Sequence, residues 1–204
     1  MKAILILNGK IDIQFIENYL SKKSEDVFAV DGAYNLMSNT SIVINGVIGD
    51  LDSIHSIPNN IKVIKTSDQN FTDFEKAIHF LIQKNYTEVD VLGASGLEMD
   101  HFLGNLHVTS KYLDQINIAF YDPKQRYFLL NTSRTITNCQ NRTISLIPFP
   151  YVHNLTTTGL QYPISESNLK LGNNISLRNF ATHDRVNLTF KHGCIAVFIA
   201  LHEI

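Results

Sequence analysis

Ile48-Gly49-Asp50-Leu51-Asp52-Ser53 and Asp68-Gln69-Asn70-Phe71-Thr72-Asp73-Phe74-Glu75-Lys76-Ala77 are the stretches of this chain that decide its fold. Each follows an apolar run: residues 42–44 and 47–48 precede the first stretch, and residues 61–64 precede the second. If these runs are parallel strands, both acidic groups lie beyond carboxyl ends of strands, where open α/β sheets bind ligands. The two stretches therefore predict an α/β sheet with a polar site along one edge.

Acidic residues follow nearly every apolar run in the first half of the chain. They are Asp31, Asp50, Asp52, Asp68 and Asp100, with Asp73 shortly after Asp68. Each alone has an ordinary explanation, since Gly and Asp favour turns and a carboxylate stabilises the start of a helix. Chance turns would not place acids at so many strand ends, and clustered carboxylates repel unless a cation lies between them. Mg²⁺ suits such a cluster, because it takes one or two carboxylates and completes its shell with water and phosphate oxygens.

Apolar runs and helical spacing alternate from residue 3 to residue 120. Predicted strands cover residues 3–7, 27–30, 42–48, 61–64, 89–92 and 116–120, and predicted helices cover 11–22, 34–37, 72–82 and 100–113. This alternation predicts a Rossmann-like parallel α/β sheet domain over residues 1–125.

The helix after Phe71 is the best marked of these elements. Thr72 and Glu75 have the spacing of a capping box, and an apolar stripe follows them. Asp73 and Lys76 then lie on the same side of the first turn. On its own, Lys76 would be an ordinary solvated lysine of a helix surface.

The character of the chain changes after Pro123. Short segments rich in β-branched and aromatic residues follow at 127–130, 135–137, 143–147, 175–177, 186–190 and 194–199, with turn residues between them. No long helical stripe remains. The second half therefore predicts an all-β domain over residues 126–204, a sandwich or a barrel-like fold.

The composition indicates a soluble globular protein with no nucleic-acid or membrane partner. The chain has 204 residues, 44% hydrophobic and 18% charged, with a formal net charge of -2. This charge gives no reason to expect a polyanion as partner, and no apolar run is long enough to span a membrane. Two cysteines, Cys139 and Cys194, are too few for a disulfide framework. We expect a cytoplasmic protein.

The ordered motifs resemble those of the thiamine pyrophosphokinase family. Residues 48–53 resemble its Gly-Asp-x-Asp-Ser motif, and residues 68–77 are similar to its Asp-Gln-x-x-Thr-Asp-x-x-Lys-Ala signature. Residues 31–33 and the segment from Gly93 to Asn105 resemble its Asp-Gly-Gly/Ala turn and its Gly-rich Asp-His segment. In the second half, residues 145–148, 157–163 and 172–179 resemble motifs of its β domain.

The resemblance implies an enzyme that transfers a diphosphate group from ATP to the hydroxyethyl oxygen of thiamine, giving thiamine diphosphate and AMP. It implies Mg²⁺ on Asp50, Asp52, Asp73 and Asp100, and catalytic roles for Asp73, Asp100 and Lys76. The substrate-binding residues that it implies are Asp31, Gln69, Thr72, Gly93, Ser95, Gly96, His101, Tyr162, Ser176 and Asn179. The α/β domain would bind ATP and Mg²⁺, the β domain would bind thiamine, and the thiamine site would lie at the interface of a homodimer.

Two positions depart from the family pattern. Glu98 stands where the family usually has Arg, and Phe180 follows Asn179 where Glu is usual. Glu98 puts an acid near the expected triphosphate, so a non-catalytic binder of thiamine or nucleotide is an alternative. A phosphotransferase or nucleotide hydrolase that keeps the metal site but uses another acceptor is a further alternative.

Overall fold

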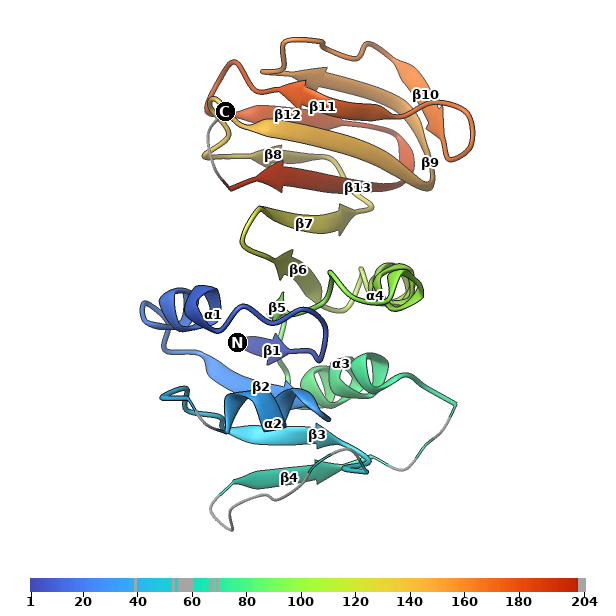
Figure 1. Cartoon of the computed structure of the whole chain (residues 1–204). Coiled ribbons are helices and arrows are strands. Elements are labelled where there is room, and N and C mark those ends of the chain that lie inside the picture. The colour runs from blue at the N-terminus through green and yellow to red at the C-terminus, as the bar shows by residue number, and fades with distance from the viewer. Residues whose placement is uncertain (39, 53, 55–60, 67, 69, 202–204) are drawn as a thin grey trace. The chain divides into compact units, whose positions relative to one another are not determined.

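The computed structural model describes residues 1–38, 40–52, 54, 61–66, 68 and 70–201. The chain forms two compact units, Met1–Pro123 and Lys124–Ile204 (Figure 1). No helix among the described residues is long and apolar enough to cross a membrane.

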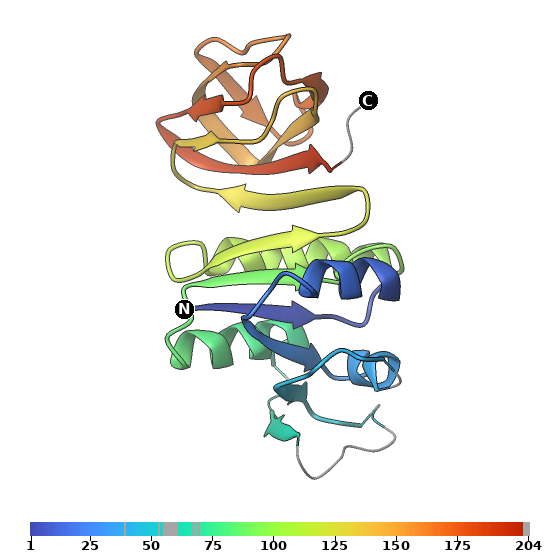
Figure 2. The ribbon, with the colours of Figure 1, turned by 90° about the vertical axis from the view of Figure 1, so that its left-hand side faces the viewer.

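Among the described residues of the first unit, six parallel strands form a sheet, as the sequence predicts. They are β1 (Lys2–Ile6), β2 (Asp26–Val30), β3 (Gly46–Gly49), β4 (Lys62–Lys65), β5 (Glu88–Leu92) and β6 (Asn117–Tyr121). Their order is β4-β3-β2-β1-β5-β6, with every neighbouring pair parallel (Figure 2). The chain thus builds outward from β1 in one direction and then returns to its other side at β5. The carboxyl ends of β1 and β5 therefore mark the switch point at which such sheets bind ligands.

In the part of the unit that the structure describes, four helices cover the two faces of this sheet. They are α1 (Ile13–Leu20), α2 (Ala33–Met37), α3 (Asp73–Gln83) and α4 (Met99–Lys111). Helices α1 and α2 lie on one face, where Ile16 and Met37 pack with Ile4 and Ile6 of β1 (Figure 1). Helix α3 packs on the opposite face, where Phe80 meets Phe28 edge-on at 5.6 Å.

The strand predicted over residues 42–48 is confirmed only in its second part, and its first residues are not a strand. Strand β3 begins at Gly46, and residues 42–44 form a loop in which Val43 is 78% exposed. Ile42 and Ile44 are apolar because they pack against the core beneath α1 and α2 from this loop. An apolar run that covers a core is indistinguishable from a short strand in sequence.

A buried carboxylate ties α1 to the sheet. Asp90, in the middle of β5, is 2% exposed and lies 2.6 Å from Lys2 Nζ, and its Oδ2 accepts a 2.5 Å hydrogen bond from the Tyr19 hydroxyl. Burial lowers the pKa of Lys2, but the hydrogen bond and charge of Asp90 prevail and hold it above its usual value. Burial, and then Asp90, also raise the pKa of Tyr19.

The turns after β1 and β5 are joined backbone to backbone. Gly9 N donates to Gly93 O at 2.8 Å, and Lys10 N donates to Ser95 O at 3.0 Å. A Cβ on Gly9 would lie 2.2 Å from Gly93 O, and a Cβ on Gly93, whose φ is +70°, would lie 2.4 Å from Leu7 O. Only glycine permits so close an approach with that backbone conformation.

The second unit is an antiparallel β-sandwich, in agreement with the predicted all-β domain. Its strands are β7 (Gln125–Leu130), β8 (Arg134–Ile136), β9 (Thr143–Thr158), β10 (Ser167–Lys170), β11 (Ser176–Phe180), β12 (Val186–Thr189) and β13 (His192–Ala200). Strand β9 belongs to two sheets: it pairs with β13, β11 and β10 in one and with β12 in the other. The side chains between the sheets, such as Leu146, Leu155 and Val197, form the core.

The sequence indicates only residues 143–147 of β9 and misses β10. Pro148 and Pro150 lie between the part of β9 that pairs with β11 and the part that pairs with β10. The ladder between β9 and β13 also shifts its register here, between Gly193 and Ile195. Proline is tolerated at such irregular positions of a strand.

Replacing Asp90 with alanine should lower the free energy of unfolding by about 3 kcal/mol, because it breaks a buried pair and a charge-assisted hydrogen bond. Asp90 raises the pKa values of Lys2 and Tyr19, so its contribution is present below about pH 10 and is lost as the pH rises through those values. Urea unfolding at about pH 7 and about pH 11 measures the free energy of unfolding of wild type and variant. The difference between the two proteins should be smaller at the higher pH. Glu88→Ala, exposed on the same strand, is the control. A loss no larger than that of the control would contradict this account.

Replacing Gly93 with alanine should lower the free energy of unfolding by about 3 kcal/mol or more. The alanine would have to keep the left-handed φ of this position, and its Cβ would overlap Leu7 O. Gly104→Ala is the matched control in the same unit: its Cβ meets nothing within 4 Å and it lies inside α4, so alanine should stabilise by up to about 1 kcal/mol. The measurement is the thermal unfolding of both variants. Equal changes in stability would show that the joined turns do not require glycine at position 93.

Candidate functional site

A cavity of about 530 Å³ opens at the switch point of the parallel sheet. Its walls come from the carboxyl ends of three strands, β1, β2 and β5, and from the first turns of α3 and α4. The segments are residues 7–9, 30–31, 72–74, 93–95, 97–98, 100–101 and 104–105. This volume is typical of a small-molecule site, and the first unit alone supplies every wall.

The cavity brings together seven of the residues that the sequence singles out. They are Asp31, Thr72, Asp73, Gly93, Ser95, Asp100 and His101. Lys76 joins them through Asp73. Asp50, Asp52 and Gly96 do not line the cavity, and Gln69 lies outside the described residues.

Asp73 and Lys76 form an ion pair at the start of α3. Thr72 caps this helix by accepting a hydrogen bond from Glu75 N at 3.2 Å, so Asp73 is its first residue. Lys76 Nζ lies 3.0 Å from Asp73 Oδ1, and the Lys76 side chain is only 6% exposed. Lys76 is therefore not a solvated surface lysine: its side chain is buried, and its ammonium group orients the Asp73 carboxylate, which lines the cavity.

Asp50 and Asp52 adopt the simpler geometry of a turn. Asp50 Oδ1 accepts a 3.2 Å hydrogen bond from Asp52 N. Asp68 likewise accepts from Asn70 N at 2.9 Å. Within the part of the chain that the structure describes, the three acidic or histidine side chains whose ligand atoms lie within 4.8 Å of one another are Glu98, Asp100 and His101. The four aspartates predicted to hold Mg²⁺ do not form such a group there.

The carboxylates of the cavity still fit a hard divalent cation. Asp73 and Asp100 both line it, the Asp73 side chain is 38% exposed, and Asp100 is exposed. One or two carboxylates with open space beside them match the preference of Mg²⁺ for a shell completed by water and phosphate oxygens. The donor set therefore suits this metal through Asp73 and Asp100, whereas Asp50 and Asp52 stay predictions.

Glu98 lies at the wall of the cavity, at the N-cap of α4. Its Oε2 is 3.4 Å from His101 Nε2, and both side chains are about three-quarters exposed, at 74% and 75%. A protonated His101 offsets the charge of Glu98 at this distance. The acid is thus in water and beside a titratable partner, where its effect on a bound anion is weak.

Sequence analysis missed Asn8, Gly9 and Asn105 as site residues. Asn8 and Gly9 end β1 as Asp31 ends β2, so the same argument from strand ends would have found them. Asn105 donates from Nδ2 to Ala94 O at 3.2 Å and fixes the turn after β5 against α4. That contact joins segments that only the fold brings together.

In the second unit, Asn179 holds the segment that carries Tyr162. Asn179 is 3% exposed, donates to Tyr162 O at 2.7 Å and accepts from Tyr162 N at 3.1 Å. Tyr162 is 67% exposed, and Ser176 pairs with Leu146 in the sheet. The structure thus brings Tyr162 and Asn179 together and gives Asn179 the task of orienting the Tyr162 backbone.

Comparison with known proteins identifies both units. Residues 17–120 match the family model of the thiamin pyrophosphokinase catalytic domain, and residues 133–195 match that of the thiamin pyrophosphokinase vitamin B1 binding domain. Two curated relatives are the thiamine pyrophosphokinase of Bacillus subtilis (strain 168), 29% identical over 133 residues, and thiamine pyrophosphokinase 1 of Arabidopsis thaliana, 30% identical over 158 residues. These matches cover 63% and 69% of this chain and span 62% and 59% of the relatives' lengths.

Solved structures share the fold over nearly the whole chain. The thiamine pyrophosphokinase from Bacillus subtilis superposes with a TM-score of 0.86 at 22% identity, covering 98% of this chain and 99% of that one. The yeast enzyme gives a TM-score of 0.77 at 17% identity, covering 98% and 86%. The two domain models match consecutive halves of one chain, and we conclude that it belongs to the thiamine pyrophosphokinase family.

Proposed function

We propose that this chain transfers a diphosphate group from ATP to the hydroxyethyl oxygen of thiamine, producing thiamine diphosphate and AMP. The observation that carries the proposal is the cavity at the switch point, where glycine-rich turns meet the Asp73–Lys76 pair and Asp100. Polyphosphate needs positive charge and backbone donors at an open sheet edge. The Lys76 ammonium beside Asp73 and a cation held by the cavity carboxylates would supply the charge, and the turns after β1 and β5 would supply the donors. Membership of the family supports the same reaction.

The two units divide the work. The first, predicted as residues 1–125, binds ATP, and the second, predicted as residues 126–204, binds thiamine. The match of residues 133–195 to a vitamin B1 binding domain supports the second assignment. Tyr162, Ser176 and Asn179 are its thiamine-site residues, with Asn179 acting through the Tyr162 backbone.

The reaction places the thiamine hydroxyl oxygen on the β-phosphorus of ATP while the bond from that phosphorus to the AMP oxygen breaks. Such a transfer depends mainly on in-line positioning and on neutralising charge. Lys76, whose ammonium group is held by Asp73, supplies a fixed positive charge. The hydroxyl proton passes to a carboxylate, Asp73 or Asp100, which are the two that line the cavity as predicted catalytic residues.

Mg²⁺ held by Asp73 and Asp100, with Asp50 and Asp52 as further predicted ligands, would neutralise charge on the phosphate oxygens. Asp31, Thr72, Gly93, Ser95, Gly96 and His101 position the nucleotide in this proposal. The proposal also includes a homodimer with the thiamine site at the subunit interface. It further includes a cytoplasmic location, with which the free thiols Cys139 and Cys194 are consistent.

The experiment is a paired product assay. The full chain is incubated with thiamine, ATP and Mg²⁺, and AMP and thiamine diphosphate are measured together. Equimolar products that disappear on chelation are the expected result. ADP instead of AMP would mean transfer of a single phosphate and would overturn the proposal, as would nucleotide hydrolysis without a thiamine product.

Asp73→Asn should lower the turnover rate by at least about 100-fold, because the amide neither accepts the proton nor pairs with Lys76. The matched control is Asp12→Asn at the start of α1, outside the cavity, where asparagine caps a helix about as well as aspartate. The product assay and a thermal unfolding curve on each variant make the comparison. Full activity of the Asp73 variant would remove this residue from the reaction.

A further inference from the structure

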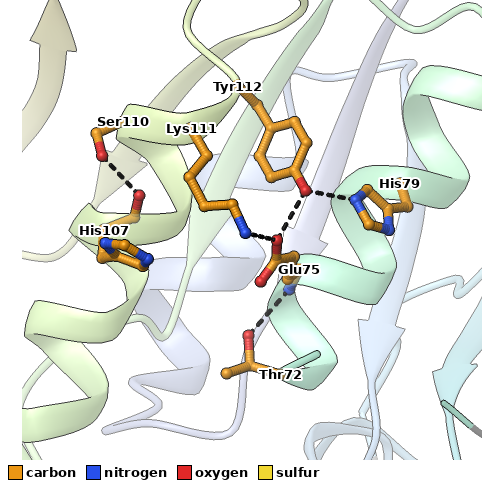
Figure 3. A network of polar contacts seen from close by, with 7 residues as sticks. All are labelled: Thr72, Glu75, His79, His107, Ser110, Lys111 and Tyr112. Atoms are coloured by element: carbon orange, nitrogen blue, oxygen red, sulfur yellow. Dashed lines mark hydrogen bonds and ion pairs between the residues drawn. The ribbon is translucent and has the colours of Figure 1, made fainter. Parts of the chain in front are cut away.

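Glu75 links α3 to α4 through two hydrogen bonds, a buried one from Tyr112 and a partly buried one from Lys111, whose side chain is 41% exposed. Its Oε1 accepts from Lys111 Nζ at 2.5 Å and from the Tyr112 hydroxyl at 2.7 Å (Figure 3). Glu75 is 5% exposed. The capping-box spacing predicts that its carboxylate turns back to the start of its own helix, but it reaches the last turn of α4 instead.

Two more side chains complete this contact. His79 Nε2 is hydrogen-bonded to the Tyr112 hydroxyl, one turn along α3 from Glu75. Since that hydroxyl donates its proton to Glu75, its oxygen accepts from His79, which places the histidine proton on Nε2. Phe71 meets the His79 ring edge-on at 4.9 Å and lies 5.8 Å from Lys111 Nζ. We call these five residues, Phe71, Glu75, His79, Lys111 and Tyr112, the α3–α4 clamp.

Burial and hydrogen bonding shift the pKa values of Glu75 and Tyr112 in opposite directions. Burial acts to raise the pKa of Glu75, but the hydrogen bonds from Lys111 and Tyr112 prevail and hold it below its usual value. Burial, and then Glu75, raise the pKa of Tyr112 to about 12. Glu75 is therefore an anion, Tyr112 is a neutral donor, and the contact has one stable hydrogen-bond direction.

The clamp lies behind the residues that face the cavity. Glu75 stands in the same turn as Asp73 and next to Lys76, whose ammonium lies 3.0 Å from Asp73. Asp100 lies in the first turn of α4, and this helix holds the Gly-rich turn through Asn105. The cavity thus takes Asp73 from α3 and Asp100 from α4, and the clamp fixes the end of α4 against the start of α3.

We infer that Glu75 is a positioning residue, which sets Asp73 and Lys76 relative to Asp100 by clamping the first turn of α3 to the last turn of α4. This inference rests on the proposed function. Glu75 touches neither nucleotide nor acceptor, and it acts through the orientation of its own helical turn. A displacement of about 1 Å at such a site costs up to about 100-fold in rate.

The test is Glu75→Gln, which keeps the shape and the Tyr112 hydrogen bond but removes the charge that holds Lys111. It should lower kcat by about 10- to 100-fold and leave KM for thiamine within about twofold, because only the phosphate-binding half is displaced. Calorimetry should show weaker binding of ATP with Mg²⁺. The matched control is Ser110→Ala, at the position next to Lys111. The Ser110 hydroxyl donates a hydrogen bond within α4, to His107 O at 2.7 Å (Figure 3). It should retain kcat, KM and ATP binding.

A second variant separates positioning from stability. If Glu75 acts through Lys111, the double variant Glu75→Gln with Lys111→Met should be no slower than Glu75→Gln alone. Additive losses in kcat would overturn the inference. So would a Glu75→Gln protein that melts earlier but keeps its kcat and its affinity for ATP with Mg²⁺, since that is the behaviour of a purely structural residue.

Failure of the proposed function is distinguishable from failure of the clamp. If the wild-type chain forms no thiamine diphosphate but binds ATP with Mg²⁺, the proposed function fails, and calorimetry on the Glu75 and Ser110 variants still decides the role of the clamp. If wild type binds no ATP with Mg²⁺, both proposals fail together.

Discussion

Backbone contact between the turns after β1 and β5 is the constraint on which the site depends. The two turns approach so closely that a Cβ on Gly9 would overlap Gly93 O, and a Cβ on Gly93 would overlap Leu7 O. Their hydrogen bonds close the sheet edge where the strand order reverses. Because the strands are parallel and central, this edge cannot shift without disturbing the core on both faces. The cavity is therefore built on central strands whose turns are held together by backbone hydrogen bonds.

Beside that edge, Asp73 and Asp100 come from the first turns of α3 and α4, and polar contacts set the positions of these helices. Lys76 holds Asp73, Asn105 holds the turn after β5, and the α3–α4 clamp joins the two helices. Buried polar contacts of this kind add specificity of position more than stability. Their arrangement suits phosphoryl transfer, in which most of the catalytic effect comes from placing charge and reactants in fixed geometry.

Much of this could be predicted from sequence because its signals are local. Apolar runs ending in Asp or Gly located the parallel strands and their carboxyl edge, and Thr72 marked the start of α3. Other features depend on tertiary contacts. The loop at 42–44 looks like a strand because it covers a core, and β9 continues past two prolines because its neighbours change there. Glu75 has the spacing of a capping box, but its carboxylate accepts hydrogen bonds from Lys111 and Tyr112, which lie 36 and 37 residues away in sequence.

Hydrogen exchange of the full chain, with and without α,β-methylene-ATP and Mg²⁺, tests whether nucleotide binds at the switch point of the sheet. The methylene group replaces the oxygen whose bond breaks in the proposed reaction, so the complex does not turn over. We predict slower exchange at residues 7–10, 72–76 and 93–96, the backbone around the cavity. Protection confined to other segments, or none at saturating ligand, would contradict a nucleotide site at the switch point of this sheet.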